Sequence, residues 1–226
     1  MRLRAVIFDV DGTLVDSQAD ILAAMTAAFK AERLSAPNRE AVLGIVGLSL
    51  DVAIPILAPD ADAMTCTRMV QGYKDFYNQR SAARGAGTLS PLYDGAREAL
   101  QRLQKQGEVL LGVATGKSRR GLDKLIEAHG FEGIFLTRQV ADDHPSKPNP
   151  SMLFQALREL GVEAVDAVMI GDTSFDMDMA RAAGMAFVGV TWGYHDTLRL
   201  AGADVLIDDF AQLDSALAGI WSKANV

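Results

Sequence analysis

The chain alternates short apolar runs with stretches of helical periodicity, and this alternation limits the folds open to it. Residues 5–8 form a β-branched and aromatic run that ends in aspartates and a glycine, the pattern of a buried strand entering a loop. Similar runs recur at residues 109–114 and 167–170 and, more weakly, at 134–136, 187–190 and 204–207. Helical spacing of apolar residues lies between them, at 96–106, 119–129, 151–160, 176–183 and 210–221. The alternation predicts an α/β fold with a doubly wound, Rossmann-like parallel sheet.

A long segment separates the first predicted strand from the second. It covers about a hundred residues, far more than a single crossover helix needs. Residues 18–83 have the pattern of several helices: residues 21–29 are apolar on one face, and Met69, Tyr73, Phe76 and Tyr77 form a second stripe. We therefore expect an all-helical cap domain at residues 17–85, inserted into an α/β core domain of residues 1–16 and 86–226.

Composition narrows the classes of partner and compartment. Apolar residues make up 49% of the chain, enough for a packed core, and 29 acidic residues against 22 basic ones give a net charge of -7. This balance argues against broad attraction to nucleic acid or anionic lipid, and no apolar stretch is long enough to span a bilayer. The single cysteine, Cys66, cannot form an intrachain disulfide. We expect a cytoplasmic protein, monomeric or homodimeric, with a small-molecule partner.

Asp9-Val10-Asp11-Gly12-Thr13 directly follows the first predicted strand. Ligands of open parallel sheets bind at this end of the strands, so the position favours a functional site. An isolated D-x-D-G is also typical of an Asx turn that ends a strand. An EF-hand is excluded, because the glycine stands fourth rather than sixth and no helix precedes the motif.

Three further motifs lie in or just beyond the loops after predicted strands. Thr115-Gly116-Lys117 combines a hydroxyl with backbone N–H groups at a helix start, which suits a phosphate, and Gly171-Asp172 begins a run to Asp176 that offers two carboxylates. Lys147 lies in the proline-rich loop Ser146-Lys147-Pro148, where a lysine is usually solvated. Asp172 and Asp176 are also candidate N-caps. Each motif is weak when taken alone.

The four motifs lie on one edge of the predicted sheet, in the chain order 9–13, 115–117, 146–148 and 171–176. Together they resemble the haloacid dehalogenase superfamily of phosphohydrolases. The resemblance covers nearly the whole chain, including the helical cap inserted after the first motif. Asp9-Val10-Asp11-Gly12-Thr13 with its continuation to Ser17, and Ser146-Lys147-Pro148, look most like phosphoglycolate phosphatases and their relatives. The resemblance implies a Mg²⁺-dependent phosphatase that hydrolyses a small phosphorylated metabolite through an aspartyl-phosphate intermediate.

The resemblance also implies the catalytic roles. Asp9 would attack phosphorus, and Asp11 would protonate the leaving alkoxide and then activate the hydrolytic water. Lys147 would supply a fixed cation beside Asp9. Thr115 and the Gly116 N–H would hold the phosphoryl oxygens.

The metal site follows from the same resemblance. The Asp9 side chain, the Asp11 backbone carbonyl and Asp172 would hold Mg²⁺, which neutralises phosphoryl oxygens and positions the reactants. Asp176 would support a water on the metal or orient Lys147, outside the direct ligand set.

Sequence details separate the branches of the superfamily and leave alternatives open. Family dehalogenases lack an acid at the position of Asp11, so ester hydrolysis is favoured over carbon–halogen cleavage. The cap loop expected to determine specificity, with Gly47, Leu48 and Ser49, carries no basic residue in residues 44–49. This weakens a β-phosphoglucomutase-like reading and also argues against strong recognition of a substrate carboxylate. A phosphomutase and a noncatalytic phosphoryl-sensing binding module remain the alternatives.

Overall fold

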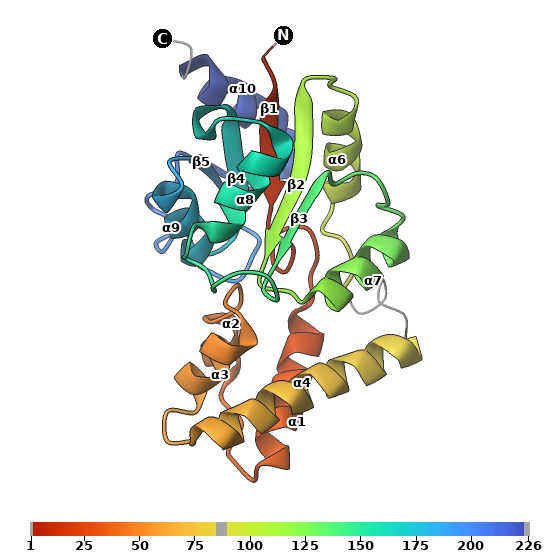
Figure 1. The fold of residues 1–226 in the computed structure, drawn as a ribbon, viewed down its shortest axis with the longest axis vertical. Coiled ribbons are helices and arrows are strands. Elements are labelled where there is room, and N and C mark those ends of the chain that lie inside the picture. The colour runs from red at the N-terminus through yellow and green to blue at the C-terminus, as the bar shows by residue number, and fades with distance from the viewer. Residues whose placement is uncertain (1, 85–89, 224–226) are drawn as a thin grey trace.

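The protein folds into a parallel α/β unit with a group of helices beneath it (Figure 1). The computed structural model describes residues 2–84 and 90–223, without the side chains of residues 81 and 84. The six strands of the sheet all run parallel, in the spatial order β3-β2-β1-β4-β5-β6. Their bounds are β1 Arg4–Phe8, β2 Val109–Thr115, β3 Thr137–Val140, β4 Ala167–Gly171, β5 Ala186–Val190 and β6 Val205–Ile207. The predicted doubly wound fold class is confirmed.

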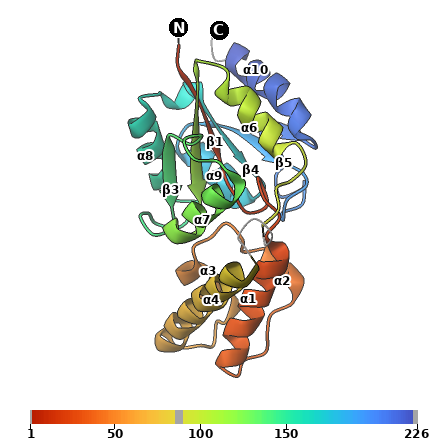
Figure 2. The same cartoon turned by 90° about the vertical axis from the view of Figure 1, so that its right-hand side faces the viewer.

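Helices cover both faces of the sheet, as the near-continuous burial of its central strands requires (Figure 2). One face is packed by α6 (Ala96–Gln104), α7 (Arg119–His129) and α10 (Leu213–Lys223). The other face is packed by α8 (Ser151–Leu160) and α9 (Ser174–Ala182). Two short 3₁₀ helices, at Ala164–Asp166 and Phe210–Gln212, precede β4 and α10. Two separate apolar clusters, one on each face, therefore hold the helices against the sheet.

One predicted strand is misplaced. The apolar run at residues 134–136 is a loop, and the strand begins only at Thr137. Phe135 is buried against the core from this loop, whereas Leu136 is 60% exposed. The strand lies at the edge of the sheet and is largely polar. Its buried Thr137 and Gln139 donate hydrogen bonds to the Glu159 carboxylate of α8. Side-chain hydrogen bonds take the place of apolar packing here, so hydropathy placed the strand wrongly.

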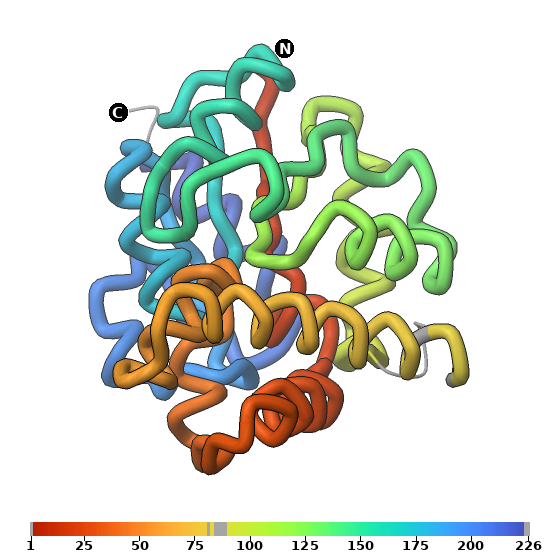
Figure 3. The backbone as a smooth tube through the Cα atoms, turned by 60° about the horizontal axis from the view of Figure 1, so that its bottom comes forward, coloured from red at the N-terminus to blue at the C-terminus, as the bar shows by residue number. Residues whose placement is uncertain are grey.

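The helices α1 (Gln18–Ala31), α2 (Arg39–Leu43), α3 (Leu50–Leu57) and α4 (Ala63–Arg84) lie together at the carboxyl edge of the sheet (Figure 3). They pack around a third apolar cluster, with Met25, Phe29, Ile54 and Met69 among its most buried members. The described residues 17–84 contribute no strand to the sheet. This group of helices is called the cap below.

The two connections between the cap and the sheet run side by side. Val15 and Leu92 form an antiparallel bridge, and the Asp16 N–H donates to the Pro91 carbonyl at 2.9 Å. The first expected crossing, at Asp16 and Ser17, therefore lies against the chain that returns to the sheet. The second expected boundary, between residues 85 and 86, lies outside the described residues.

Candidate active site

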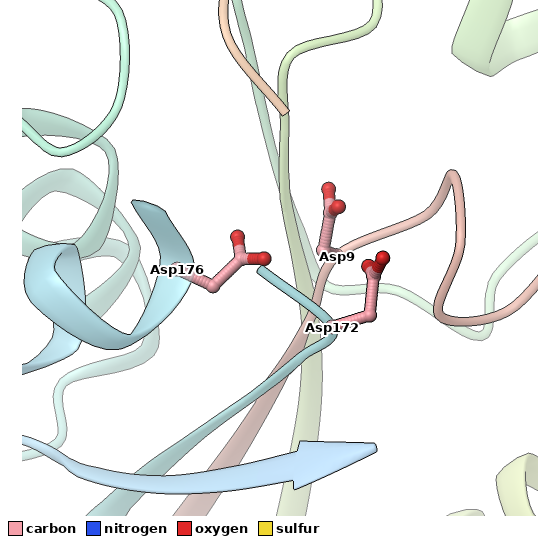
Figure 4. A group of neighbouring side chains, drawn as sticks. All are labelled: Asp9, Asp172 and Asp176. Carbon is pink, nitrogen blue, oxygen red and sulfur yellow. The ribbon is translucent and has the colours of Figure 1, made fainter. Parts of the chain in front are cut away.

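The site begins where two neighbouring strands end. Asp9 follows β1 and Asp172 follows β4, and these strands pair in register with Phe8 opposite Ile170. The Asp9 N–H donates to the Ile170 carbonyl at 2.9 Å, which keeps the chain in place one residue beyond the ladder. Figure 4 shows the two side chains next to each other, with Asp176 directed toward them from α9. Carboxylate oxygens of all three residues lie within 4.8 Å of one another.

Asp172 is held by groups from two other loops. The Thr13 hydroxyl donates to Oδ1 at 2.9 Å, and the Tyr194 N–H donates to Oδ2 at 2.8 Å. Gly12 makes room for this carboxylate: its φ is +88°, and a Cβ at this position would lie 2.3 Å from Asp172 Oδ2. The glycine of the first motif is therefore required both by its backbone conformation and by the close approach of Asp172.

Lys147 is fully buried between two carboxylates, although a lysine in a proline-rich loop is usually solvated. Its Nζ lies 2.8 Å from Asp9 Oδ1 and 2.6 Å from Asp176 Oδ1. Asp176 Oδ2 accepts hydrogen bonds from the Thr173 N–H at 3.1 Å and from the Thr173 hydroxyl at 2.7 Å. Asp176 is thus both a member of the capping box that starts α9 and a partner of Lys147. This capping box starts the helix at Ser174, two residues before the predicted start.

The buried charges at this edge do not balance. Three carboxylates, of Asp9, Asp172 and Asp176, surround one ammonium, of Lys147. Burial raises the pKa of Asp9 to about 6, against the opposing effect of Lys147, and burial together with Asp176 and Asp9 raises the pKa of Asp172. Burial disfavours the Lys147 charge, but Asp176 and Asp9 outweigh it, so that the pKa of Lys147 is raised. The protein alone leaves negative charge uncompensated here.

The donor set fits a hard divalent cation. Asp9 Oδ2 is buried and has no hydrogen-bond partner among the described residues. Both oxygens of Asp176 and both oxygens of Asp172 already accept hydrogen bonds, so Asp9 Oδ2 is the available carboxylate oxygen of this group. Oxygen ligands at carboxylates are those that Mg²⁺ prefers, and two extra positive charges would balance the cluster. Of the predicted metal and supporting residues, the structure brings Asp9, Asp172 and Asp176 together.

Thr115 and Gly116 lie at the end of β2, which is the other neighbour of β1. Thr115 is buried, and its Oγ1 accepts a hydrogen bond from the Lys117 N–H at 3.2 Å, so the hydroxyl proton remains for another acceptor. Gly116 touches the cap: a Cβ at this position would lie 2.6 Å from the Gly47 carbonyl oxygen. The predicted phosphate-binding residues and the predicted cap loop therefore meet directly.

Asp11 has partners different from those of Asp9. Its Oδ1 accepts a hydrogen bond from the Ser17 hydroxyl at 2.5 Å and lies 2.9 Å from Lys117 Nζ. Ser17 in turn donates its backbone N–H to the Tyr194 hydroxyl at 3.1 Å. The two aspartates of the first motif thus lie in separate networks, one around Lys147 and one around Lys117.

The cap loop is bound to the core at both of its ends. The Ser49 N–H donates to Ser146 Oγ at 2.9 Å, next to Lys147 in the chain. At the other end, His195 Nε2 lies 3.2 Å from the Gly44 carbonyl, while His195 Nδ1 accepts the Ser174 N–H at 3.0 Å. Gly47 lies between these contacts at a φ of +103°.

A cavity of about 290 Å³ lies between the cap and the strand ends. Its core wall contains Asp9, Asp11 and the loop from Thr115 to Ser118, and the cap loop Gly47, Leu48 and Ser49 forms part of the opposite wall. The rest of the cap wall is mostly apolar, from α1 and α4 among others. This wall includes Ile21, Met25, Ile45, Val46, Val70 and Tyr73. Lys147, Asp172 and Asp176 do not line the cavity.

Sequence reasoning missed two lysines on the cavity wall. Lys117 belongs to the second motif, from which the sequence analysis used only the Thr115 hydroxyl and the backbone N–H groups. In the structure the Lys117 side chain pairs with Asp11. Lys74 lies on α4, lines the cavity, and has no hydrogen bond or ion pair with any described residue. Its spacing offered a signal, since residues 70, 73, 74 and 77 share one face of a helix and Lys74 interrupts that apolar face.

Over most of its length the chain is similar to proteins named as phosphatases. It is 37% identical over 216 residues to "Probable phosphatase IndB" of Dickeya dadantii, with 93% of this chain and 92% of that protein covered. It is 32% identical to an N-acetylmuramic acid 6-phosphate phosphatase of Pseudomonas putida, covering 97% of this chain and all of that protein. It is 29% identical to a phosphoglycolate phosphatase of Haemophilus influenzae, covering 91% and 94%.

The fold has close counterparts among solved structures. A predicted phosphatase from Clostridium acetobutylicum superposes with a TM-score of 0.84 at 24% identity, over 97% of this chain and 100% of that one.

Within the part of the chain that the structure describes, no helix combines the length and apolarity needed to cross a membrane.

Residues 6–190 match the family described as haloacid dehalogenase-like hydrolase. This span contains all four motifs and both connections to the cap. The resemblance predicted from the sequence is confirmed, and the chain belongs to the haloacid dehalogenase-like hydrolase family.

Proposed function

We propose that this protein is a Mg²⁺-dependent phosphatase that hydrolyses a small phosphorylated metabolite through a phosphorylated Asp9. The observation that carries the proposal is the Asp9 side chain. It is buried, lines the cavity, keeps one oxygen without a partner, and lies beside both a fixed ammonium and a second carboxylate. The chain belongs to a hydrolase family and is similar, over nearly their full length, to relatives named as phosphatases. Both findings support a phosphoric monoester hydrolase.

In the first half of the reaction, an Asp9 carboxylate oxygen attacks phosphorus and the bond from phosphorus to the ester oxygen breaks. Asp11 donates a proton to the departing oxygen, so the product leaves as an alcohol. Lys147, held 2.8 Å from Asp9 Oδ1, offsets the repulsion between the nucleophile and the phosphoryl group. The Thr115 hydroxyl and the Gly116 N–H orient the phosphoryl oxygens.

In the second half, water attacks the phosphorus of the aspartyl phosphate. Asp11, now a carboxylate, takes the proton from this water, and the Asp9 carboxylate is regenerated as inorganic phosphate forms. Asp176 keeps Lys147 in position through its 2.6 Å contact. Mg²⁺ bound by Asp9, Asp172 and the Asp11 carbonyl would neutralise charge on the phosphoryl oxygens.

The cap supplies the remaining part of this proposal. Residues 17–85 act as a cap domain over a core of residues 1–16 and 86–226, and Gly47, Leu48 and Ser49 cover the phosphoryl site. The relatives named above act, by their names, on monoesters with quite different leaving groups. The cap wall has apolar residues and a lysine, Lys74, with no partner in the described part of the chain. It therefore suits a metabolite that combines an apolar part with an acidic group. The single, buried Cys66 is consistent with a reducing cytoplasm.

The test is phosphate release from a panel of sugar phosphates, phosphoglycolate, N-acetylmuramic acid 6-phosphate, nucleotides and 4-nitrophenyl phosphate. Each substrate is measured with Mg²⁺ and with a chelator, and Asp9→Asn serves as the blank. We expect Mg²⁺-dependent release that falls at least ~10³-fold in Asp9→Asn while the fold is retained. Release that is unchanged in Asp9→Asn, or that does not respond to the chelator, would remove the proposed chemistry.

A further inference from the structure

The shortest polar contacts of Asp11 both fall on one oxygen. The Ser17 hydroxyl and the Lys117 ammonium both approach Oδ1, at 2.5 Å and 2.9 Å. No described residue donates a hydrogen bond to Oδ2, and the side chain lines the cavity. The two oxygens of this carboxyl group therefore have different environments before any substrate arrives.

Lys117 is placed by the core and the cap together. Its side chain is only 9% exposed, and its Nζ lies 3.5 Å from the Tyr77 hydroxyl and 5.2 Å from the centre of the Tyr77 ring. Tyr77 belongs to α4 of the cap, and its hydroxyl lies 3.2 Å from Ser90 Oγ. An ammonium with so little exposure is costly unless it is paired, so the Asp11 carboxylate and the Tyr77 ring together keep it in one place.

We infer that Lys117 is a positioning residue for Asp11, which acts with Ser17 to select the carboxyl oxygen that carries the catalytic proton. The inference rests on the proposed function, because it assumes that Asp11 is the acid and base of the reaction. It gives a role to the Lys117 side chain, to which the four motifs assign none.

The selection follows from hydrogen-bond valence. Two donors directed at Oδ1 need an oxygen that accepts, so a proton on Asp11 resides on Oδ2. Oδ2 accepts no hydrogen bond from the described residues, so it can meet the leaving oxygen of a substrate in the cavity. Without Lys117, the carboxyl group loses one of the two donors that distinguish its oxygens, and the proton is delivered from a mixture of orientations.

Lys117 also matches the change in charge during proton transfer. Asp11 passes from a neutral acid to a carboxylate as the P–O bond breaks, and an ammonium 2.9 Å away stabilises the charge that appears. This stabilisation is greater in the transition state than in the ground state, so it acts on the rate of the chemical step. The need for a proton from Asp11 is strong for an alkoxide leaving group and weak for a nitrophenolate, which departs without a proton.

The leaving group therefore provides the test. The variants Lys117→Met, Lys117→Arg, Asp11→Asn and the double variant Asp11→Asn with Lys117→Met are assayed on two substrates. These are 4-nitrophenyl phosphate and the best alkyl phosphate of the panel. Lys124→Met is the matched control, since Lys124 Nζ also reaches the cap, 3.4 Å from Asn78 Oδ1, but does not contact Asp11.

We expect Lys117→Met to lower kcat on the alkyl phosphate by ~10- to 100-fold, less than the ~10²- to 10⁴-fold typical of losing a general acid. On 4-nitrophenyl phosphate the expected loss is below about threefold. Lys117→Arg should recover most of the alkyl activity, and Lys124→Met should resemble the parent on both substrates. In the Asp11→Asn background, Lys117→Met should cause no further loss, since its effect passes through Asp11.

Equal losses on the two substrates, or a further loss in the double variant, would overturn the inference and place Lys117 in direct contact with substrate. An unchanged kcat in Lys117→Met would overturn it as well. If Lys117→Met fails to fold, Lys117→Gln is used with the same criteria, because it keeps a neutral donor. Failure of the proposed function is separate, since it appears as an active Asp9→Asn variant whatever the Lys117 variants do.

Discussion

The two walls of the cavity are built on opposite principles. On the core side, the residues directly behind the wall, Asp172, Lys147 and Asp176, are fully buried, and each has partners from other loops at hydrogen-bond distance. These residues follow strands whose positions are set by parallel pairing on both sides of β1. The groups that would act on phosphorus are therefore fixed before a substrate binds.

The cap side relies on packing instead. Its wall is formed largely by aliphatic and aromatic side chains, and its lysine, Lys74, has no partner among the described residues. It meets the core through a few separate contacts, such as Ser49 with Ser146 and Gly44 with His195. Under the proposed function, this difference assigns the reaction to the core and the choice of leaving group to the cap.

The largest expected effect comes from Lys147→Met, which removes the buried cation behind the core wall, beside Asp9. Asp9 and Asp176 would remain buried without their ammonium, and breaking a buried pair in this way typically costs about 3–5 kcal/mol. The activity should also fall by at least ~10²-fold, because the cation beside the nucleophile is lost. Thermal unfolding of the metal-free protein and phosphate release measure the two effects.

Lys105→Met is the matched control, since it makes the same change at an exposed lysine of the core. It should leave both the melting temperature and the activity close to those of the parent. A Lys147→Met protein as stable as this control would show that the buried carboxylates do not depend on Lys147, and it would break the contrast between the walls.

Much of the fold could be predicted because each strand and helix carries its own signal. The predicted helices at 119–129 and 151–160 match α7 and α8 at both ends, since Ser118 caps one and glycines end both. The edge strand β3 could not be placed, because its burial depends on hydrogen bonds with Glu159, which lies more than fifteen residues further along the chain.

The site divides in a similar way. Asp9, Thr115 and Asp172 could be expected together from sequence, because adjacent parallel strands end at one edge. The residue pattern alone favoured a solvated Lys147, and only the resemblance put it beside Asp9 and Asp176, because its burial depends on a carboxylate from α9. The contacts of Tyr194 to Asp172 and Ser17 could not be predicted either, because they come from a loop after β5. Contacts across loops are set by tertiary packing rather than by local sequence.

A smaller and more selective effect is expected from Lys74→Met on the cap wall. If Lys74 meets an acidic group of the substrate, the KM for phosphoglycolate should rise about tenfold, the value of one charge-assisted hydrogen bond. The KM for 4-nitrophenyl phosphate, which has no such group, should change little. Initial-rate kinetics on the two substrates measure the difference.

Lys30→Met, at an exposed lysine of the cap helix α1, provides the comparison for this variant. It should leave both KM values unchanged. A rise in KM of the same size for both substrates in Lys74→Met would mean that Lys74 acts on the phosphoryl group, and the division of labour between the walls would then be wrong.

The smallest effect concerns the contact that joins the two walls. His195 lies almost wholly buried between Gly44 of the cap and Ser174 of the core, and burial, with Arg199 nearby, lowers its pKa to about 4. The unfolded chain takes up a proton near the ordinary histidine value of about 6.5. Between these values the unfolded state binds more protons, so the free energy of unfolding decreases as the pH falls from about 6.5 to 4. In His195→Asn, where no proton is bound and the Asn oxygen can still accept the Ser174 N–H, the melting temperature should fall less over this range. If the melting temperatures of the two proteins fall equally between pH 6.5 and 4, His195 does not link the cap to the core in a pH-dependent way.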